Sequence, residues 1–424
     1  MVPPIVTQPA GSGDEGSLTR PLVPLGGAVG APMQDLMLVP TPLPLGFRCH
    51  TANVGIKDHT LDFVVVAADT VCAAAGVFTQ SHFAGPSVRL SRRHVAGGIA
   101  RAVVVTSKNA NVATGDRGLA DAAEIVAGVA AHLGCPSEQV LIAQTGVIGR
   151  LLPMDRVRAG LAGLPSPLPG SDAETVARAI MTTDTVAKIA TATVAGSDAV
   201  VVGVAKGVGM IEPNMATLIT LLFTDADVAP ADLDAVFRRV VDRTFNSVSI
   251  DTDTSTSDTA IVLASGAAGR VDLAALEAAL LDVALSLTKQ VARDGEGATK
   301  LIEVRVDGAT DDGQAKRVAK AIVNSPLVKT AVHGADPNWG RVAMAVGKCS
   351  DEPGIDERRV VIRFGEQEVF PVPVDAAGLD RLASYMRGED VLIHVSLGIA
   401  HGTAAVYGCD LSDGYVRINA DYTT

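Results

Sequence analysis

Two apolar patterns recur along the chain and predict a mixture of strands and helices. Compact β-branched runs at 61–68 (LDFVVVAA) and 100–107 (ARAVVVTS) have the length and composition of buried strands. Apolar residues that return every three or four positions predict a long helix over 272–295. Further strands are expected at 359–365 and 391–399. This mixture predicts an α/β or α+β protein.

Capping signals set the ends of two more helices. The segment 121–134 has helical spacing and ends at Gly134, a residue that suits the left-handed position after a helix. Ser171 and Glu174 have the spacing of a capping box and predict a helix that runs to about Met181.

Residues 1–44 are rich in Pro, Gly and Ser and are expected to form a flexible or loosely docked extension. Folded patterning begins near residue 46. No interior linker and no repeat of 20 to 50 residues divides the remainder into independent domains.

Composition narrows the class of partner. The chain has 424 residues, 48% of them hydrophobic, and a net charge of −12, which argues against a nucleic-acid partner. Only 3% of the residues are aromatic, so stacking platforms for single strands are scarce. No apolar run reaches the roughly 18 residues of a membrane helix. The first 20 residues lack the pattern of a secretory signal.

Metal and disulfide chemistry are not expected. The five cysteines are widely spread without a paired motif, which favours a reducing, cytoplasmic setting. The eight histidines lack metal-ligand spacing, and His333 is more typical of a loop or core residue than of a base. The run 249–266 is dense in Asp, Ser and Thr. A strand edge held by side-chain hydrogen bonds is favoured there over a calcium loop.

The segment IEPNMATLIT (211–220) allows two interpretations. It is either the ordinary start of a strand or a segment whose Ala216–Thr217 peptide bond is cleaved. A threonine hydroxyl becomes a useful nucleophile when a base is adjacent, and an N-terminal threonine carries that base as its own α-amine. Cleavage would proceed through attack of the same hydroxyl on the preceding carbonyl.

Other polar segments favour the second interpretation. An apolar strand ends at Thr145–Gly146, where a hydroxyl and backbone N–H groups could stabilise an oxyanion. IMTTDT (180–185) supplies further hydroxyls after a helix. Glu296 lies between glycines in a turn after the long helix.

At these residues the chain resembles the ornithine acetyltransferases (glutamate N-acetyltransferases). The matching segments run in order from about residue 46 to residue 424: KNANVATGDRG, TGVIGR, IMTTDT, AKGVGMIEPNMATL, FNSVSIDTDTSTSDT, DGEGATKLIEV, NSPLVKTAVHGADPNWGRVAMAVGK and GCDLSDGYVRINADYTT. The resemblance is closest to the branch associated with clavulanic-acid-type biosynthetic clusters. It covers nearly the whole chain apart from the extension.

The resemblance implies an enzyme that cleaves itself before Thr217. Residues 45–216 would form the folded part of an α chain and residues 217–424 a β chain. The implied fold is a sandwich of stacked sheets with outer helices, similar to N-terminal-nucleophile enzymes. The implied reaction is ping-pong transfer of acetyl from N-acetyl-L-ornithine to L-glutamate through acetyl-Thr217, in a heterotetramer of two α and two β chains.

The resemblance also assigns roles to residues, without a metal or a bound cofactor. Thr145 and Gly146 match the oxyanion-hole pair and Thr217 the nucleophile. The matching substrate contacts are Thr182, Thr183, Lys206, Thr217, Glu296, Asn419 and Thr424. Lys206 suits a substrate carboxylate and Glu296 an amino group.

Several alternatives stay open on sequence alone. The same scaffold could act as an N-acyl-amino-acid hydrolase if water replaced the amine acceptor, or as an uncleaved binding protein. Acetyl-CoA is an alternative donor, and no residue decides for or against it. Arginine synthesis and a secondary-metabolite pathway fit the sequence equally. Glu212 stands directly before Pro213, at a position where many family members carry a small residue.

Overall fold

The computed structural model describes residues 41–212 and 218–421, and within them the chain forms two β-sheets. The larger sheet has the order β4-β3-β2-β8-β7-β6-β5, with β1 paired to β2; the smaller has the order β11-β10-β12-β9-β13. The strands are β1 (Phe47–Ala52), β2 (Phe63–Phe78), β3 (Ile99–Asn109), β4 (Val140–Val147), β5 (Lys188–Thr193), β6 (Val200–Lys206), β7 (Ile219–Asp227), β8 (Thr259–Arg270), β9 (Leu301–Ala309), β10 (Val361–Phe364), β11 (Gln367–Phe370), β12 (Asp390–Ser396) and β13 (Gly402–Cys409).

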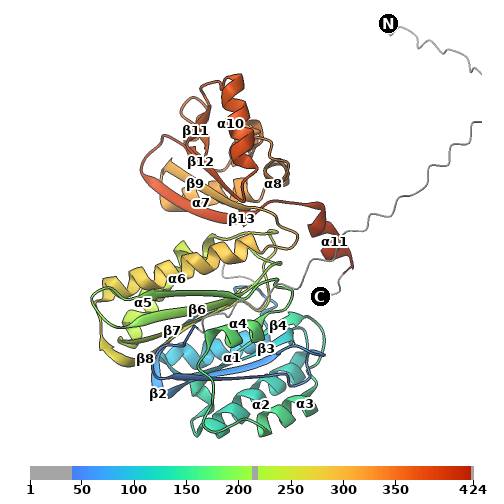
Figure 1. The fold of residues 1–424 in the computed structure, drawn as a ribbon, viewed down its shortest axis with the longest axis vertical. Helices are drawn as coiled ribbons and strands as arrows, with labels where there is room; N and C mark the ends of the chain where they lie inside the picture. Colours follow the sequence, from blue (N-terminus) through green and yellow to red (C-terminus); the bar gives the residue numbers. More distant parts are fainter. Residues whose placement is uncertain (1–40, 213–217, 422–424) are drawn as a thin grey trace, which may run out of the picture. The chain divides into compact units, whose positions relative to one another are not determined.

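Helices cover these sheets, as Figure 1 shows. They are α1 (Pro86–His94), α2 (Gly115–Leu133), α3 (Met154–Ala162), α4 (Ala173–Ile180), α5 (Pro230–Arg243), α6 (Leu273–Arg293), α7 (Asp312–Val323), α8 (Pro326–His333), α9 (Trp339–Gly347), α10 (Ala376–Met386) and α11 (Asp413–Asp421). The strands and helices expected from apolar spacing are all present, including the long helix, which is α6.

The large sheet bends into two stacked layers because β2 belongs to both. The first part of β2 pairs with β3 and its last part, from Ala73, pairs with β8. The pairing with β3 shifts between Ala67 and Cys72, and the exposed residues 69–71 lie at this bend. Layer one therefore holds β1, β3, β4 and the start of β2, and layer two holds the end of β2 with β5 to β8.

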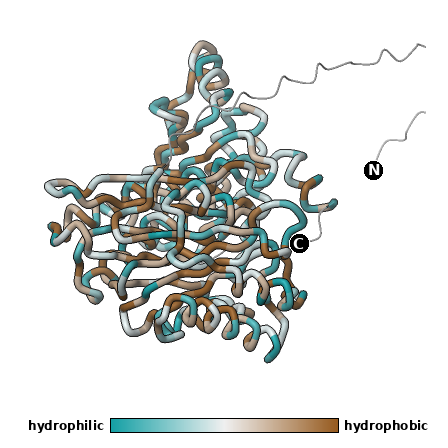
Figure 2. The backbone as a smooth tube through the Cα atoms, turned by 60° about the horizontal axis from the view of Figure 1, so that its bottom comes forward, coloured by the Kyte–Doolittle hydropathy of each residue, from teal (hydrophilic) through white to brown (hydrophobic). Residues whose placement is uncertain are grey.

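Alternate residues of each strand fill two different cores, because successive side chains point to opposite faces. In β3, Val103 and Val105 face the core between the layers, whereas Ala102 and Val104 face α2. In β7, Leu221 and Phe223 face the same central core, whereas Leu222 faces α5 and α6. Apolar segments accordingly run through the middle of the layers in Figure 2. The expected sandwich of stacked sheets with outer helices is confirmed.

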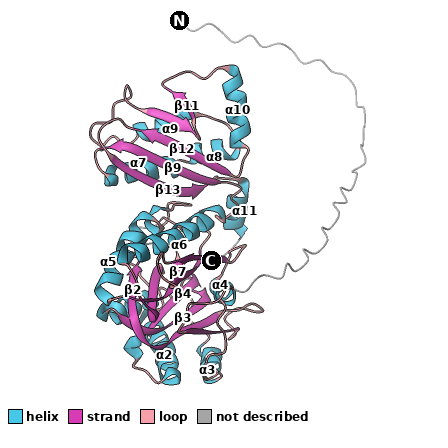
Figure 3. Cartoon of the chain, turned by 60° about the vertical axis from the view of Figure 1, so that its left-hand side comes forward, coloured by secondary structure: helices cyan, strands magenta, loops and turns pink. Residues whose placement is uncertain are grey.

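The smaller sheet adjoins layer two through α6. Leu301, Tyr407 and Cys409 share a core with α6, and the opposite face of the sheet packs against α7, α8 and α9. Figure 3 shows α6 between the two sheets. The turn that follows α6 leads directly into β9, so the end of this helix stands where both sheets meet.

One predicted helix start was wrong by a residue. Asp172, not Ser171, caps α4, and its carboxylate accepts the N–H groups of Glu174 and Thr175 at 3.3 and 3.2 Å. The predicted end of α2 is confirmed, because Gly134 adopts φ +65° there. Within 41–212 and 218–421, no helix is long and apolar enough to cross a membrane.

The order of strands has a consequence for any cut between β6 and β7. Strands β1 to β6 precede residue 213 and β7 follows residue 217. Yet β7 and β8 lie between β2 on one side and β6 on the other. Two pieces divided at this point would be interleaved within one sheet.

Candidate active site

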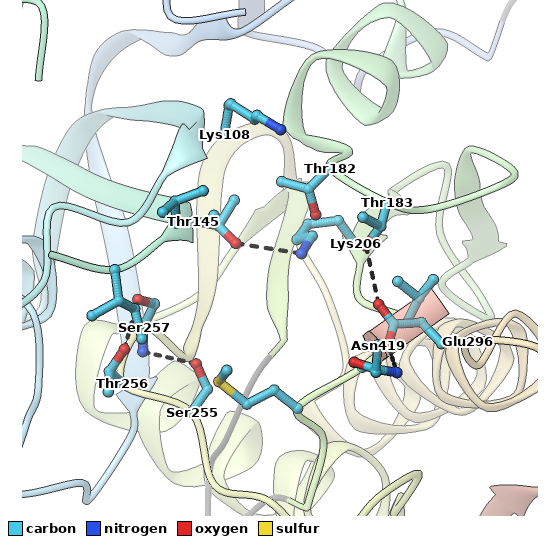
Figure 4. Close-up of a pocket in the computed structure, with 16 residues that line it drawn as sticks. Lys108, Thr145, Thr182, Thr183, Lys206, Ser255, Thr256, Ser257, Glu296 and Asn419 are labelled. Atoms are coloured by element: carbon cyan, nitrogen blue, oxygen red, sulfur yellow. Dashed lines mark hydrogen bonds between the residues drawn. The ribbon is translucent and has the colours of Figure 1, made fainter. Parts of the chain in front are cut away.

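A pocket opens where strands of the two layers end close together, and most of the predicted site residues line it. It holds the side chains or backbone of Thr145, Gly146, Thr182, Thr183, Lys206, Glu296 and Asn419. Figure 4 shows these groups around one cavity, with Lys206 between Thr145 and the Glu296–Asn419 pair. They come from five separate segments of the chain, so the fold alone brings them together.

The end of β4 forms one wall. Parallel pairing places Ser107 of β3 beside Thr145 and Lys108 beside Gly146. Gly146 has φ +126°, and a Cβ atom there would lie 2.1 Å from the carbonyl carbon and oxygen of Lys108. Only glycine fits this backbone approach.

Lys206, the last residue of β6, reaches across from layer two. Its Nζ donates to the Thr145 hydroxyl at 3.3 Å, and its side chain is buried. Burial lowers the pKa of Lys206, which the nearby Asp184 carboxylate partly opposes. An ammonium group with this degree of burial interacts strongly with any anion that enters the pocket.

Glu296 forms the opposite wall. Its backbone N–H donates to the Val208 carbonyl at 2.8 Å, which attaches the turn after α6 to the segment after β6. Its carboxylate accepts from Asn419 Nδ2 at 2.9 Å and, at 3.5 Å, from the Thr183 hydroxyl. A Cβ atom on Gly209 would lie 2.5 Å from Glu296 Oε2, so a larger residue there would displace this carboxylate.

The chain enters β7 directly beside this pocket. Lys206 is the register partner of Ile219, so the first residue of β7 lies beside the lysine. Asp258 accepts the N–H of Leu218 at 2.7 Å, and its other carboxylate oxygen is buried and has no hydrogen-bond partner within the described residues. Burial raises the pKa of Asp258 well above its usual value.

Three predicted site residues, Ala216, Thr217 and Thr424, lie outside the described residues. The pocket also has lining residues to which the sequence analysis assigned no role: Lys108, Val147, Ile148, Val208, Met210, Ser255, Thr256 and Ser257. The Asp-, Ser- and Thr-rich run at 249–266 was the only signal for the last three. Its carboxylates accept backbone N–H groups, as expected for a hydrogen-bonded strand edge.

The arrangement combines a buried cation, a carboxylate and hydroxyl groups within one cavity. This combination suits a small zwitterionic ligand, whose carboxylate and amino group need partners of opposite charge. Across residues 41–212 and 218–421, no three His, Cys, Asp or Glu side chains gather as metal ligands would. All five cysteines are free thiols.

Comparison with known proteins gives concordant matches over most of the chain. The model of the ArgJ family matches residues 48–424. The chain is 54% identical over 389 residues to an arginine biosynthesis bifunctional protein ArgJ of Nostoc sp., covering 92% of this chain and 100% of that protein. It is 56% identical over 387 residues to a glutamate N-acetyltransferase of Streptomyces clavuligerus, covering 90% and 98%.

Two solved structures match shorter parts. The crystal structure of the arginine biosynthesis bifunctional protein ArgJ from Bacillus halodurans has 39% identity and a TM-score of 0.45, and covers 48% of this chain and 98% of that chain. The ornithine acetyltransferase of Mycobacterium tuberculosis complexed with ornithine has 33% identity and a TM-score of 0.35, covering 42% and 94%.

Proposed function

The chain belongs to the ArgJ family, and on this premise we propose that it is a self-processing glutamate N-acetyltransferase. The enzyme takes an acetyl group from N-acetyl-L-ornithine and passes it to L-glutamate. One observation carries the proposal: Lys206 donates a hydrogen bond to Thr145 across the two layers and pairs with Ile219, which follows Thr217 by two positions in the sequence.

Self-processing produces the free N-terminal threonine that acts as the nucleophile. The Thr217 hydroxyl attacks the carbonyl carbon of Ala216, and the peptide bond becomes an ester with a free α-amine on Thr217. Water then hydrolyses this ester, which restores the hydroxyl and leaves residues 1–216 with a new carboxylate. The α-amine serves as the base that the hydroxyl needs.

Acetyl transfer uses the same hydroxyl twice. It attacks the acetyl carbonyl of N-acetylornithine, and the bond from the carbonyl carbon to the α-nitrogen breaks as that nitrogen takes up a proton. Ornithine leaves and acetyl-Thr217 remains. The α-amine of glutamate then attacks this ester, gives N-acetylglutamate and frees the hydroxyl.

The pocket residues have separate roles in this cycle. The Thr145 hydroxyl and the Gly146 N–H stabilise the oxyanion of each tetrahedral intermediate. Lys206 binds the substrate carboxylate, and Glu296, held by Asn419, binds the side-chain amine of ornithine. Thr182 and Thr183 complete the contacts, together with Thr424. The cycle needs no metal and no resident cofactor, and acetyl-CoA is a second donor to be tested.

The proposal extends to assembly and setting. Two cleaved αβ units pair into a heterotetramer, whose mass a native sizing experiment would give. The enzyme works in the cytoplasm on free amino acids, consistent with five unpaired thiols.

Thr217→Ala tests the nucleophile. The wild-type chain should give two bands on a denaturing gel, one with the N-terminal sequence Thr-Leu-Ile-Thr, whereas the variant should give one band and no acetyl transfer. Thr220→Val is the matched control, because the buried Thr220 hydroxyl in β7 has no hydrogen-bond partner within the described residues. Turnover by an uncleaved Thr217→Ala chain would overturn the proposal.

Product analysis separates transfer from hydrolysis. Without glutamate, a ping-pong transferase exchanges labelled ornithine into N-acetylornithine, since the acetyl-enzyme returns its acetyl group to ornithine. A hydrolase instead releases acetate continuously, at a rate that glutamate does not change. The second result would favour the hydrolase alternative.

A further inference from the structure

A buried ion triad lies behind the pocket. Lys188 Nζ contacts Asp184 Oδ1 at 2.8 Å and Asp294 Oδ2 at 2.5 Å. The side chains of Lys188 and Asp184 are fully buried, and that of Asp294 is 7% exposed. Two carboxylates and one ammonium group leave this triad with one net negative charge beside the pocket.

The triad connects three walls of the pocket. Asp184 also accepts the N–H of Thr182 at 3.0 Å and the N–H of Gly207, the residue after Lys206, at 2.7 Å. Asp294 accepts both the N–H and the hydroxyl of Thr185. Asp294 also stands two residues before Glu296. The turn at 182–185, the end of β6 and the turn after α6 are therefore fixed to one another.

Two members of this triad, Asp184 and Lys188, influence the pKa of Lys206. The charged groups that act on it are Asp184, Lys188, Asp258, Glu296 and, from the loop after β1, Lys57. Burial, the largest influence, lowers the pKa of Lys206; Asp184, the largest charge effect, raises it, and Lys188 lowers it. Burial raises the pKa of Asp258 well above its usual value, and Asp258 influences the pKa of Lys206 less than Asp184 and Lys188 do.

The Asp184 carboxylate is itself negatively charged at neutral and alkaline pH. Burial raises its pKa, but Lys206, Lys188 and the N–H of Gly207 outweigh this and hold the pKa at about 2. The carboxylate is thus ionised throughout the range in which Lys206 titrates. A buried lysine without such a counter-charge loses its proton readily.

We propose that Asp184 is a positioning residue that keeps Lys206 protonated. The ammonium form is the one that can bind a carboxylate, so the triad determines the pH range over which an α-amino acid enters the pocket. This inference rests on the proposed function in one respect, namely that the ligand carries a carboxylate.

The test compares the alkaline limb of the pH profile in three variants. Asp184→Asn removes the attraction, so Lys206 should lose its proton earlier and the limb should move about one to three pH units lower. Above the new limb, KM should rise roughly tenfold per pH unit while kcat changes less. Lys188→Met removes a repulsion, so its limb should move higher.

Asp294→Asn is the matched control. It replaces a carboxylate with an amide on the same lysine and weakens the same triad, but Asp294 is not among the main charges acting on Lys206. If the triad had only a structural role, Asp184→Asn and Asp294→Asn would shift the alkaline limb equally. The proposal predicts a clearly larger shift in Asp184→Asn and an opposite shift in Lys188→Met.

Folding and function are checked separately. Circular dichroism and the cleavage gel identify any variant that fails to fold, and the opposite directions keep the test decisive if one variant is lost. Calorimetric binding of L-ornithine and of L-glutamate across pH gives a readout that needs no turnover. Absent acetyl transfer in the wild type would overturn the proposed function alone, whereas equal or absent shifts among the variants would overturn the role of Asp184.

Discussion

Gly146 is the residue at which the pocket tolerates least change. Its φ of +126° suits glycine, and an added Cβ would meet the backbone of Lys108 rather than a movable side chain. Either β4 or β3 would have to shift, and Thr145 would shift with it. Gly149, three residues later, also has positive φ, but a Cβ atom there meets nothing within 4 Å.

This contrast gives a prediction with its own control. Gly146→Ala should lower kcat by about 10²-fold or more, the magnitude typical of a lost oxyanion donor. Gly149→Ala should cost about 1 kcal/mol of stability from backbone strain, with kcat near the wild-type value. Steady-state kinetics beside thermal melts will separate the two, and similar kcat losses in both would contradict the steric argument.

At this scale the sequence predicted part of the site. Residues in recognisable segments, such as Thr145, Lys206 and Glu296, do gather in the pocket. Asp184 was not predicted, although it lies within the quoted segment IMTTDT. Its importance comes from Lys188 and Gly207, which only the folded chain places beside it.

Helix α4 shows what local patterns can and cannot decide about an element. Its existence was predicted, but Asp172 and Ser171 are both good caps, and only tertiary contacts choose between them. The Ser171 carbonyl accepts the N–H of Leu43, which fixes the chain in an extended form before the helix. The strand at 61–68 was likewise predicted too short, because the exposed bend at 69–71 interrupts the apolar run while β2 continues to Phe78.

The cap leads to a prediction about stability. Asp172→Ala removes the acceptor of two N–H groups and should lower the free energy of unfolding by about 1 kcal/mol. Ser171→Ala should change it by only a few tenths of that amount. Denaturant titrations in the uncleaved Thr217→Ala background would measure both, and a greater loss in Ser171→Ala would restore the capping-box assignment.

For the whole molecule, the order of strands decides how the cleaved pieces behave. Strands β7 and β8 of the proposed β chain lie between β2 and β6 of the proposed α chain, and each boundary carries a full set of register pairs. The sequence predicted a sandwich and one folded body, but it could not predict this interleaving. Strand order depends on long-range pairing, which leaves little trace in local patterns.

Interleaving predicts that cleavage does not separate the pieces. A tag on residue 1 should retain residues 217–424 through native purification, and the two should part only in denaturant. Residues 217–424 expressed alone should lack a cooperative melt, because the β7–β8 pair would have lost β2 on one side and β6 on the other. A folded, monomeric 217–424 fragment would contradict this expectation.

Because of the same interleaving, cleavage makes refolding of the enzyme much more difficult. Before the cut, refolding is a first-order process within a single chain. After cleavage, an unfolded molecule consists of two chains that must meet by diffusion and insert their strands between one another in a single sheet. Recovery then falls with dilution, and the working lifetime depends on the rate of unfolding rather than on an equilibrium.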